Sequence, residues 1–150
     1  MQFEVSSYAK INSFLNILGE RADGYHEIYT HFQLLDLKDT LFFSPSSQNH
    51  AFCDGITKEE NIILKSIKWF NNKFGKNQHF SVTVEKIIPI GAGLGGGSSN
   101  AAATLCFLCD YHGIERKLLD FHEISFELGA DIPIFIFGKS AFASGIGEKI

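Results

Sequence analysis

Residues 89–103 read PIGAGLGGGSSNAAA, and this glycine-rich stretch decides how the rest of the chain is interpreted. An alternating apolar segment precedes it and an alanine-rich segment follows it, which predicts a strand, a glycine loop and then a helix. Glycine allows backbone N–H groups to turn toward a ligand that approaches closely. The start of a helix adds unpaired N–H donors and the positive end of a dipole. Together these features predict a phosphate-binding site.

Three other interpretations of this loop are weaker. A Walker A loop needs a lysine next to its last glycine, and none occurs between Lys86 and Lys117. Residues 91–96 satisfy the dinucleotide-binding pattern G-x-G-x-x-G, but Asp110, the acid at the right distance, lies in a helical pattern instead of after a second strand. A flexible linker is disfavoured because strand and helix signals bracket the loop so closely.

The length and composition favour a single folded domain. The chain has 150 residues, of which 45% are hydrophobic, and 13 Lys and Arg against 17 Asp and Glu give a net charge of −4. No basic run supports binding to nucleic acid or to an anionic membrane. The N-terminus does not resemble a signal peptide, and no apolar run approaches the roughly 18 residues of a membrane helix.

The cysteines and histidines give no sign of a metal or disulfide framework. Three cysteines (Cys53, Cys106 and Cys109) are an odd number, and the C-x-x-C pair lies in an apolar helical pattern. We interpret them as buried thiols and not as a redox or zinc site. The six histidines are scattered singly. We therefore expect a protein of the reducing cytoplasm.

The pattern along the chain predicts an α+β fold with antiparallel strands first and helices packed on one side. Strands are predicted at 3–5, 8–17, 27–35, 39–43 and 78–88, with a turn at 21–24, a polar loop at 44–55 and a closing pair of strands at 132–137 and 141–143. Helices are predicted at 58–74, from Ser98 or Ser99 as N-cap to His112, and at 115–128.

Two charged residues elsewhere in the chain are candidates for catalysis. Alternation along a strand places Lys10 and Asn12 on the same face, and Asp131 lies in a predicted loop between Gly129 and Pro133. A carboxylate is a candidate base for phosphoryl transfer to an alcohol, and a lysine is a candidate electrostatic partner. Taken alone, however, Asp131 is also typical of a turn and Lys10 of a solvated strand face.

Five motifs resemble those of the GHMP kinases, the family of galactokinase, homoserine kinase and mevalonate kinase. They are AKIN at 9–12, RADGYH at 21–26, the glycine loop at 89–103, GADIP at 129–133 and GIGE at 145–148. The set is most similar to a branch of the family that phosphorylates a cytidine diphosphate-linked alcohol in the non-mevalonate route to isoprenoid precursors. The resemblance implies a kinase that uses ATP and Mg²⁺. It also implies the GHMP N-terminal fold, a mixed sheet with helices on one side, similar to ribosomal-protein domain 2.

The resemblance also implies roles for particular residues. Lys10 and Asp131 would be the catalytic couple, and Asn12 would contact substrate. Tyr25 would stack on the cytosine ring and His26 would hydrogen-bond to its edge, although the two residues also fit simple strand packing. The ATP site would contain Asn61 and Lys86 near the adenine, together with Pro89, Ile90, Gly91, Ala92, Gly93, Leu94, Gly95, Gly96, Gly97, Ser98 and Ser99. Asn61 also fits a water-facing helix position. For Ser98 and Ser99 the sequence is equally compatible with capping the helix and with binding phosphate or Mg²⁺, and it does not identify the metal ligands.

We expect residues 1–150 to be the N-terminal ATP-binding domain of such an enzyme, with its C-terminal domain outside this chain. Apolar surface left by that domain would favour self-association. The alternatives are a module that binds nucleotide without turnover, a dinucleotide-dependent oxidoreductase, and a GHMP kinase for homoserine or mevalonate. The Tyr25-His26 pair after the turn argues against the last of these.

Overall fold

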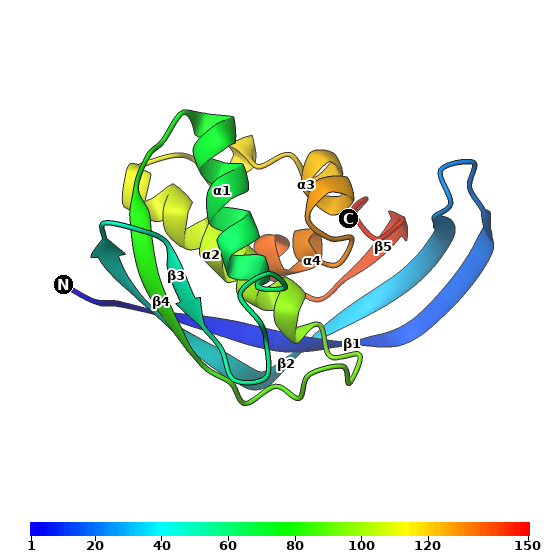
Figure 1. Cartoon of the computed structure of the whole chain (residues 1–150). Coiled ribbons are helices and arrows are strands. Elements are labelled where there is room, and N and C mark those ends of the chain that lie inside the picture. Colours follow the sequence, from blue (N-terminus) through cyan, green and yellow to red (C-terminus); the bar gives the residue numbers. More distant parts are fainter.

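Two long antiparallel strands, β1 (Phe3–Glu20) and β2 (His26–Ser46), form the frame of the molecule, and a turn joins them. A computed structural model describes residues 1–150 (Figure 1). The predicted breaks within these strands are wrong. The register between β1 and β2 shifts between Tyr8 and Lys10, between Asn12 and Phe14, and between Ile17 and Gly19. Each irregularity interrupts the two-residue alternation of side chains without ending the strand, so the pattern resembles several short strands.

Three further strands complete a five-stranded sheet. β4 (His79–Glu85) pairs antiparallel with one end of β2, and β5 (Ala141–Gly145) pairs antiparallel with the other end. β3 (His50–Phe52) pairs in parallel with β4, which makes the sheet mixed. The prediction of a loop throughout 44–55 is therefore wrong. A strand of three residues is too short to show a recognisable alternation.

The helices cover one face of this sheet, which confirms the α+β class (Figure 1). They are α1 (Ile62–Phe74), α2 (Gly96–His112), α3 (Phe121–Glu127) and α4 (Ile132–Phe137), with a short 3-10 helix, η1, at Arg116–Leu118. Helices α1 and α2 end at Gly75 and Gly113, which both adopt the left-handed conformation. No helix is long and apolar enough to cross a membrane.

Several predicted helix and strand boundaries need correction. The segment 132–137, predicted as a strand, is the helix α4, because Pro133 fits the first turn of a helix and a short apolar run has no decisive period. Helix α1 begins at Ile62 and not near Lys58, since Asn61 caps it. The helix predicted at 115–128 is broken, since Asp120 caps a separate helix, α3. These capping side chains decide where each helix starts.

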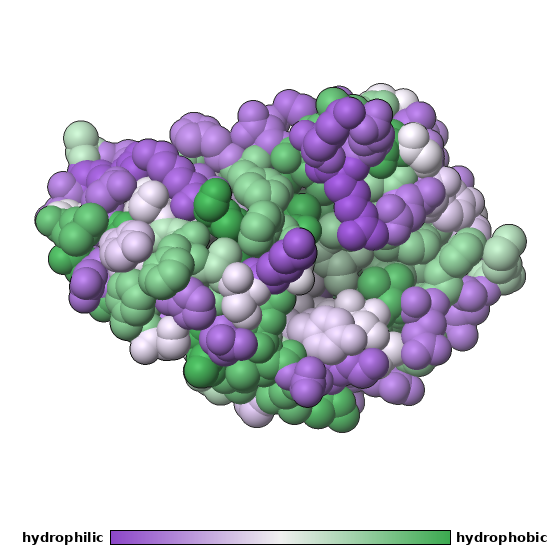
Figure 2. Space-filling view, turned by 180° about the vertical axis from the view of Figure 1, so that it is seen from behind, coloured by the Kyte–Doolittle hydropathy of each residue, from purple (hydrophilic) through white to green (hydrophobic).

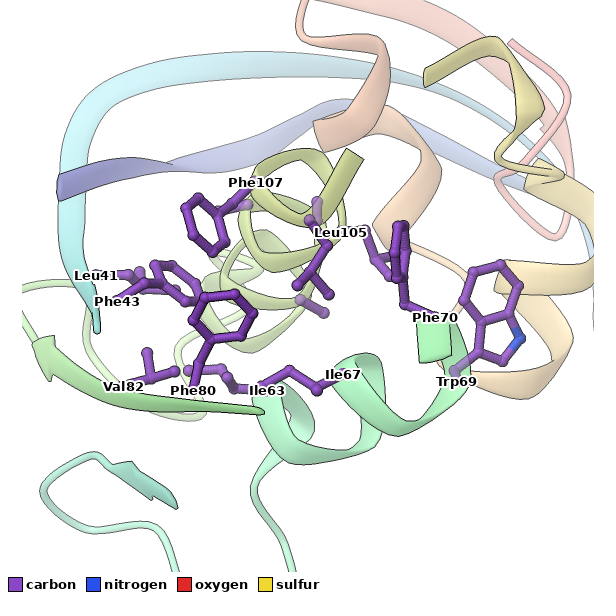
Figure 3. Close-up of a cluster of buried hydrophobic side chains, with 14 of the residues drawn as sticks. Leu41, Phe43, Ile63, Ile67, Trp69, Phe70, Phe80, Val82, Leu105 and Phe107 are labelled. Atoms are coloured by element: carbon purple, nitrogen blue, oxygen red, sulfur yellow. The ribbon is translucent and has the colours of Figure 1, made fainter. Parts of the chain in front are cut away.

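The core lies between the sheet and helices α1 and α2 (Figure 3). The aromatic ring of Phe107 in α2 stacks on that of Phe43 in β2, with centroids 4.1 Å apart. Phe80 of β4 meets Phe107 edge to face at 5.2 Å. Ile63 and Ile67 of α1 are fully buried against this cluster. Such packing fixes α2, and with it the glycine loop that leads into this helix, on the sheet.

Candidate active site

The glycine loop wraps around the N-terminus of α2. Gly91, Gly93 and Gly95 have positive φ angles of 72°, 75° and 70°, in alternation with Ala92 and Leu94. Such alternation turns successive N–H groups to one side and forms a concave anion site. Gly95 occupies the N-cap position with no side-chain cap, so the prediction that Ser98 or Ser99 caps the helix is wrong. The first N–H groups of α2 are left without intrahelical acceptors and are available to a ligand.

Lys10 joins strand β1 to this loop. Its backbone N–H donates to the carbonyl oxygen of Leu94 at 2.9 Å, and its ammonium donates to the carbonyl oxygen of Gly93 at 3.3 Å. The ammonium also donates to Oδ1 of Asn12 at 2.7 Å, as expected for two side chains on one strand face. Lys10 is buried. Its charge is therefore held by fixed partners and not by bulk water.

The same ammonium forms an ion pair with Asp131, whose Oδ2 lies 3.2 Å away. Asp131 is the N-cap residue of α4, but its side chain makes no capping hydrogen bond. The carboxylate is therefore free to face Lys10. About a third of the Asp131 side chain is exposed, so the carboxylate is also accessible to a ligand.

These groups line one cavity of about 410 Å³. It is lined by Lys10, Ile56, Lys86, Asp131 and residues 89–98 of the glycine loop. The cavity thus combines backbone donors at a helix N-terminus, two lysines and one accessible carboxylate. This combination suits an anionic ligand and proton transfer at its edge.

The two serines of the loop have different surroundings. Ser98 lines the cavity, whereas Ser99 is buried and its hydroxyl accepts a hydrogen bond from Ser7 at 2.8 Å. Asn61 is buried as the N-cap of α1, where its Oδ1 accepts from the N–H of Ile63. It does not line the cavity. Ser98 is therefore the serine that can reach a ligand there, and the geometry gives Asn61 a capping contact.

Lys86 lies at the cavity wall and is paired with a carboxylate, Asp39, that is not among the predicted site residues. Its ammonium donates to Oδ2 of Asp39 at 2.6 Å, and Asp39 is fully buried. Burial alone would raise the pKa of Asp39. The hydrogen bonds from Lys86, Ile88, Asn100 and Ile87 outweigh burial and hold that pKa below its ordinary value.

A signal for Asp39 was present in the sequence. Asp39, Leu41 and Phe43 alternate on the core-facing side of β2, and all three are fully buried. A carboxylate at an inward position between apolar neighbours needs several donors to be tolerated there. The phase of the alternation therefore marks Asp39 as a candidate for a fixed polar contact.

Tyr25 and His26 lie away from the cavity, at the end of the β1–β2 hairpin. The ring of Tyr25 meets Phe126 of α3 edge to face, with centroids 5.2 Å apart, and the guanidinium of Arg21 lies 5.9 Å from the centroid of the Phe126 ring. Both Tyr25 and His26 are exposed. The hairpin thus presents an aromatic ring and an imidazole to solvent, supported from behind by α3.

The chain matches known proteins over nearly its whole length. Residues 61–139 match the family "GHMP kinases N terminal domain". The chain is 49% identical over 148 residues to "4-diphosphocytidyl-2-C-methyl-D-erythritol kinase" of Francisella tularensis subsp. novicida (strain U112), and 44% identical over 151 residues to the protein of that name in Acinetobacter baylyi. These alignments cover 95% and 97% of this chain and 54% of each relative, so the chain spans about half their length.

Solved structures of related kinases also match the chain. A crystal structure of 4-(cytidine 5'-diphospho)-2C-methyl-D-erythritol kinase matches 98% of this chain and 53% of that chain, with a TM-score of 0.81 at 36% identity. A crystal structure of mevalonate kinase matches with a TM-score of 0.57 at 19% identity, covering 93% of this chain and 48% of that chain. The second match supports the fold alone. The first supports both the fold and a closer relationship.

Proposed function

The chain belongs to the GHMP kinase family, and we propose that residues 1–150 are the N-terminal, ATP-binding domain of a kinase for 4-diphosphocytidyl-2-C-methyl-D-erythritol. The kinase transfers the γ-phosphoryl group of ATP to the 2-hydroxyl of this alcohol, a step of non-mevalonate isoprenoid precursor biosynthesis. The observation that carries the proposal is the Lys10–Asp131 ion pair, which faces the same cavity as the glycine loop. The substrate follows from the names of the relatives at 44–49% identity.

The triphosphate of ATP lies along the glycine loop, with its charge held by backbone N–H groups and the N-terminus of α2. Lys86 and Pro89 to Ser98 contribute to the nucleotide site from the cavity wall. Asn61 and Ser99 hold the framework of this site, because their side chains are engaged in a helix cap and in a buried hydrogen bond.

Asp131 accepts the proton of the attacking hydroxyl while the oxygen bonds to the γ-phosphorus and ADP leaves. The ammonium of Lys10 orients the Asp131 carboxylate through their ion pair, and it offsets negative charge that develops on the transferred group. Asn12 fixes Lys10 through its hydrogen bond and contacts the alcohol. Tyr25 and His26 bind the cytosine, by stacking and by hydrogen bonding to the base edge.

Mg²⁺ accompanies ATP in this proposal. Hard oxygen donors suit this ion, and proteins usually bind it with one or two oxygen ligands plus the substrate phosphates. The Ser98 hydroxyl lines the cavity and fits such a role. When bound, the ion would neutralise phosphate charge during transfer.

The test is phosphate transfer from labelled Mg-ATP to three alcohols: 4-diphosphocytidyl-2-C-methyl-D-erythritol, mevalonate and homoserine. The natural full-length protein is expected to label only the first. Comparable labelling of mevalonate or homoserine would contradict the substrate assignment. The 150-residue chain is assayed beside it, and ATP binding without transfer by this chain would identify it as a nucleotide-binding part that is insufficient for turnover.

We also propose that the 150-residue chain on its own self-associates through uncovered apolar surface. Ile17 and Leu18 on the β1–β2 hairpin are 63% and 65% exposed, and hydrophobic surface gathers at this end of the molecule (Figure 2). Exposed apolar patches of this kind favour association. Sedimentation velocity is expected to give a species larger than 16.7 kDa, and a strict monomer at all concentrations would contradict this.

A further inference from the structure

We propose that Asp39 is a positioning residue for the nucleotide, which acts by holding the ammonium of Lys86 at the wall of the cavity. The proposal rests on the proposed function, because it assigns the cavity to ATP. Asp39 itself does not line the cavity. Its effect on the ligand would therefore pass through its hydrogen-bond partners.

The carboxylate of Asp39 has four donors and no exposed surface. Oδ1 accepts from the backbone N–H groups of Ile87 and Ile88 at 2.7 and 2.8 Å. Oδ2 accepts from the ammonium of Lys86 at 2.6 Å and from Nδ2 of Asn100 at 3.0 Å. Four donors match the acceptor capacity of one ionised carboxylate. The group is therefore saturated, and its position is fixed by the segment that follows β4 and by α2.

These donors lie on either side of the glycine loop. Ile87 and Ile88 immediately precede the loop, and Asn100 follows it in α2. Nδ2 of Asn100 also donates to the hydroxyl of Ser7 in β1 at 2.8 Å. One carboxylate on β2 thus joins the chain that enters the loop to the helix that leaves it. The loop is held at both ends by the same buried charge.

Lys86 is the partner of Asp39 that can contact the ligand directly. Its side chain is about nine-tenths buried, it lines the cavity, and Asp39 is the one hydrogen-bond acceptor that its ammonium has in the structure. An ammonium has three N–H donors, so two remain for a ligand. The nitrogen lies only 2.7 Å from where a Cβ would stand on Gly96, the first residue of α2. Asp39 therefore holds a cation directly beside the helix N-terminus.

Asp39→Asn separates this role from a purely structural one. The remaining carbonyl oxygen of the amide can still accept from Ile87 and Ile88, but its NH2 group faces the donors of Lys86 and Asn100. In the full-length protein we expect the Kd and KM for Mg-ATP to rise about 10- to 100-fold, because hydrogen bonds to charged groups are worth that much. The KM for the alcohol should stay unchanged. A purely structural residue would lower stability and affect both KM values equally.

Two further variants complete the test. Lys86→Met removes the ammonium, and the double variant Asp39→Asn/Lys86→Met is expected to bind ATP as weakly as Lys86→Met alone, because Asp39 acts through Lys86. Asp36→Asn, at an exposed position of the same strand, is the matched control and should bind ATP like the wild type. The double variant contains no unpaired buried ammonium, and in Lys86→Met the Asp39 carboxylate keeps its donors from Ile87, Ile88 and Asn100. These two variants can therefore be compared even if Asp39→Asn alone does not fold.

Additive losses in the double variant, or an unchanged ATP Kd in Asp39→Asn, would overturn the proposal. Calorimetric titration with Mg-ATP needs no second substrate. A failure of the substrate assignment would therefore leave this test intact, whereas a wild-type protein that does not bind ATP would refute the proposed function itself.

Discussion

The ammonium nitrogen of Lys10 lies 3.2 Å from Oδ2 of Asp131, although Lys10 lies in the first strand and Asp131 is the N-cap residue of the last helix. Lys10 is anchored on the other side by the carbonyl oxygens of Gly93 and, through its backbone, Leu94. The ion pair and the glycine loop thus share one side chain. A substitution that moves the glycine loop should therefore also move the Asp131 carboxylate. A substitution at Asp131 should likewise affect the loop.

Gly95 is the loop position that should tolerate substitution least. Its φ is 70°, and a Cβ there would stand 2.8 Å from the ring of Phe135. We expect Gly95→Ala to destabilise the protein by about 1–3 kcal/mol and to weaken ATP binding, because strain and overlap displace the loop. Thermal unfolding with calorimetric ATP titration measures both effects.

Gly97→Ala is the comparison for stability, since a Cβ at Gly97 meets nothing within 4 Å and the residue is helical. Alanine there should leave the melting temperature unchanged or raise it, because glycine is a poor helix former. Equal destabilisation by the two substitutions would refute the argument from left-handed geometry.

The buried carboxylate of Asp39 should make stability depend on pH on the acid side. Its pKa is held below the ordinary value of 3.8 by the hydrogen bonds that outweigh burial. A lowered pKa contributes stability that is present above about pH 4 and is lost as the pH falls through the folded-state pKa. The free energy of unfolding of the wild type, minus that of Asp39→Asn, should therefore shrink as the pH falls below about 4 toward the folded-state pKa of Asp39.

Urea unfolding at a series of pH values measures this difference. A stability difference between wild type and Asp39→Asn that stays constant down to the lowest pH would show that Asp39 does not titrate in this way.

The three cysteines should react slowly in the native protein. Burial raises the pKa of Cys109 to about 11, and it also raises the pKa of Cys53 and Cys106, so all three remain thiols at neutral pH. Only the thiolate reacts readily with disulfide reagents. We expect Cys106, the one that is not fully buried, to react first, and the other two only after unfolding. Rapid labelling of all three in native protein would contradict this.

Tyr25 offers a test of the cytosine site that uses a neighbouring aromatic as control. Tyr25 and Tyr29 are 40% and 42% exposed on the same hairpin. Stacking on a base is worth about 1–3 kcal/mol, so Tyr25→Ala should raise the KM for the cytidine substrate about 10- to 100-fold and leave the KM for ATP unchanged. Tyr29→Ala should change neither by more than about twofold, since the Tyr29 ring stacks on Phe142 instead. Equal effects of the two substitutions would argue against a specific role for Tyr25.

The sequence predicts the α+β class and the loop between strand and helix, because strong periodicity and glycine signals are local. It does not predict that residues 132–137 form α4, since a six-residue apolar run fits strand and helix equally and only packing decides. It also divides β1 and β2 into pieces, because the pattern alone does not distinguish a bulge from a strand end.

In the candidate site, too, local features can be predicted from the sequence and contacts between distant elements cannot. The shared face of Lys10 and Asn12 follows from alternation along one strand, and their hydrogen bond confirms it. The meeting of Lys10 with Asp131 depends on how distant elements pack, and the residues alone do not predict it; only the resemblance to a family does. For Asp39, the alternation along β2 indicates an inward position, but its partners cannot be predicted because they come from the chain on both sides of the glycine loop. Their convergence is a property of the tertiary structure.

The most direct test of the account is phosphate transfer from Mg-ATP to 4-diphosphocytidyl-2-C-methyl-D-erythritol by the full-length protein and its Asp131→Asn variant, with ATP affinity measured in parallel. Loss of a positioned base costs about 10²- to 10⁴-fold in rate. We predict a loss of kcat in this range with ATP binding retained. A variant that keeps the wild-type kcat would contradict the role of Asp131 and, with it, the catalytic interpretation of the Lys10–Asp131 pair.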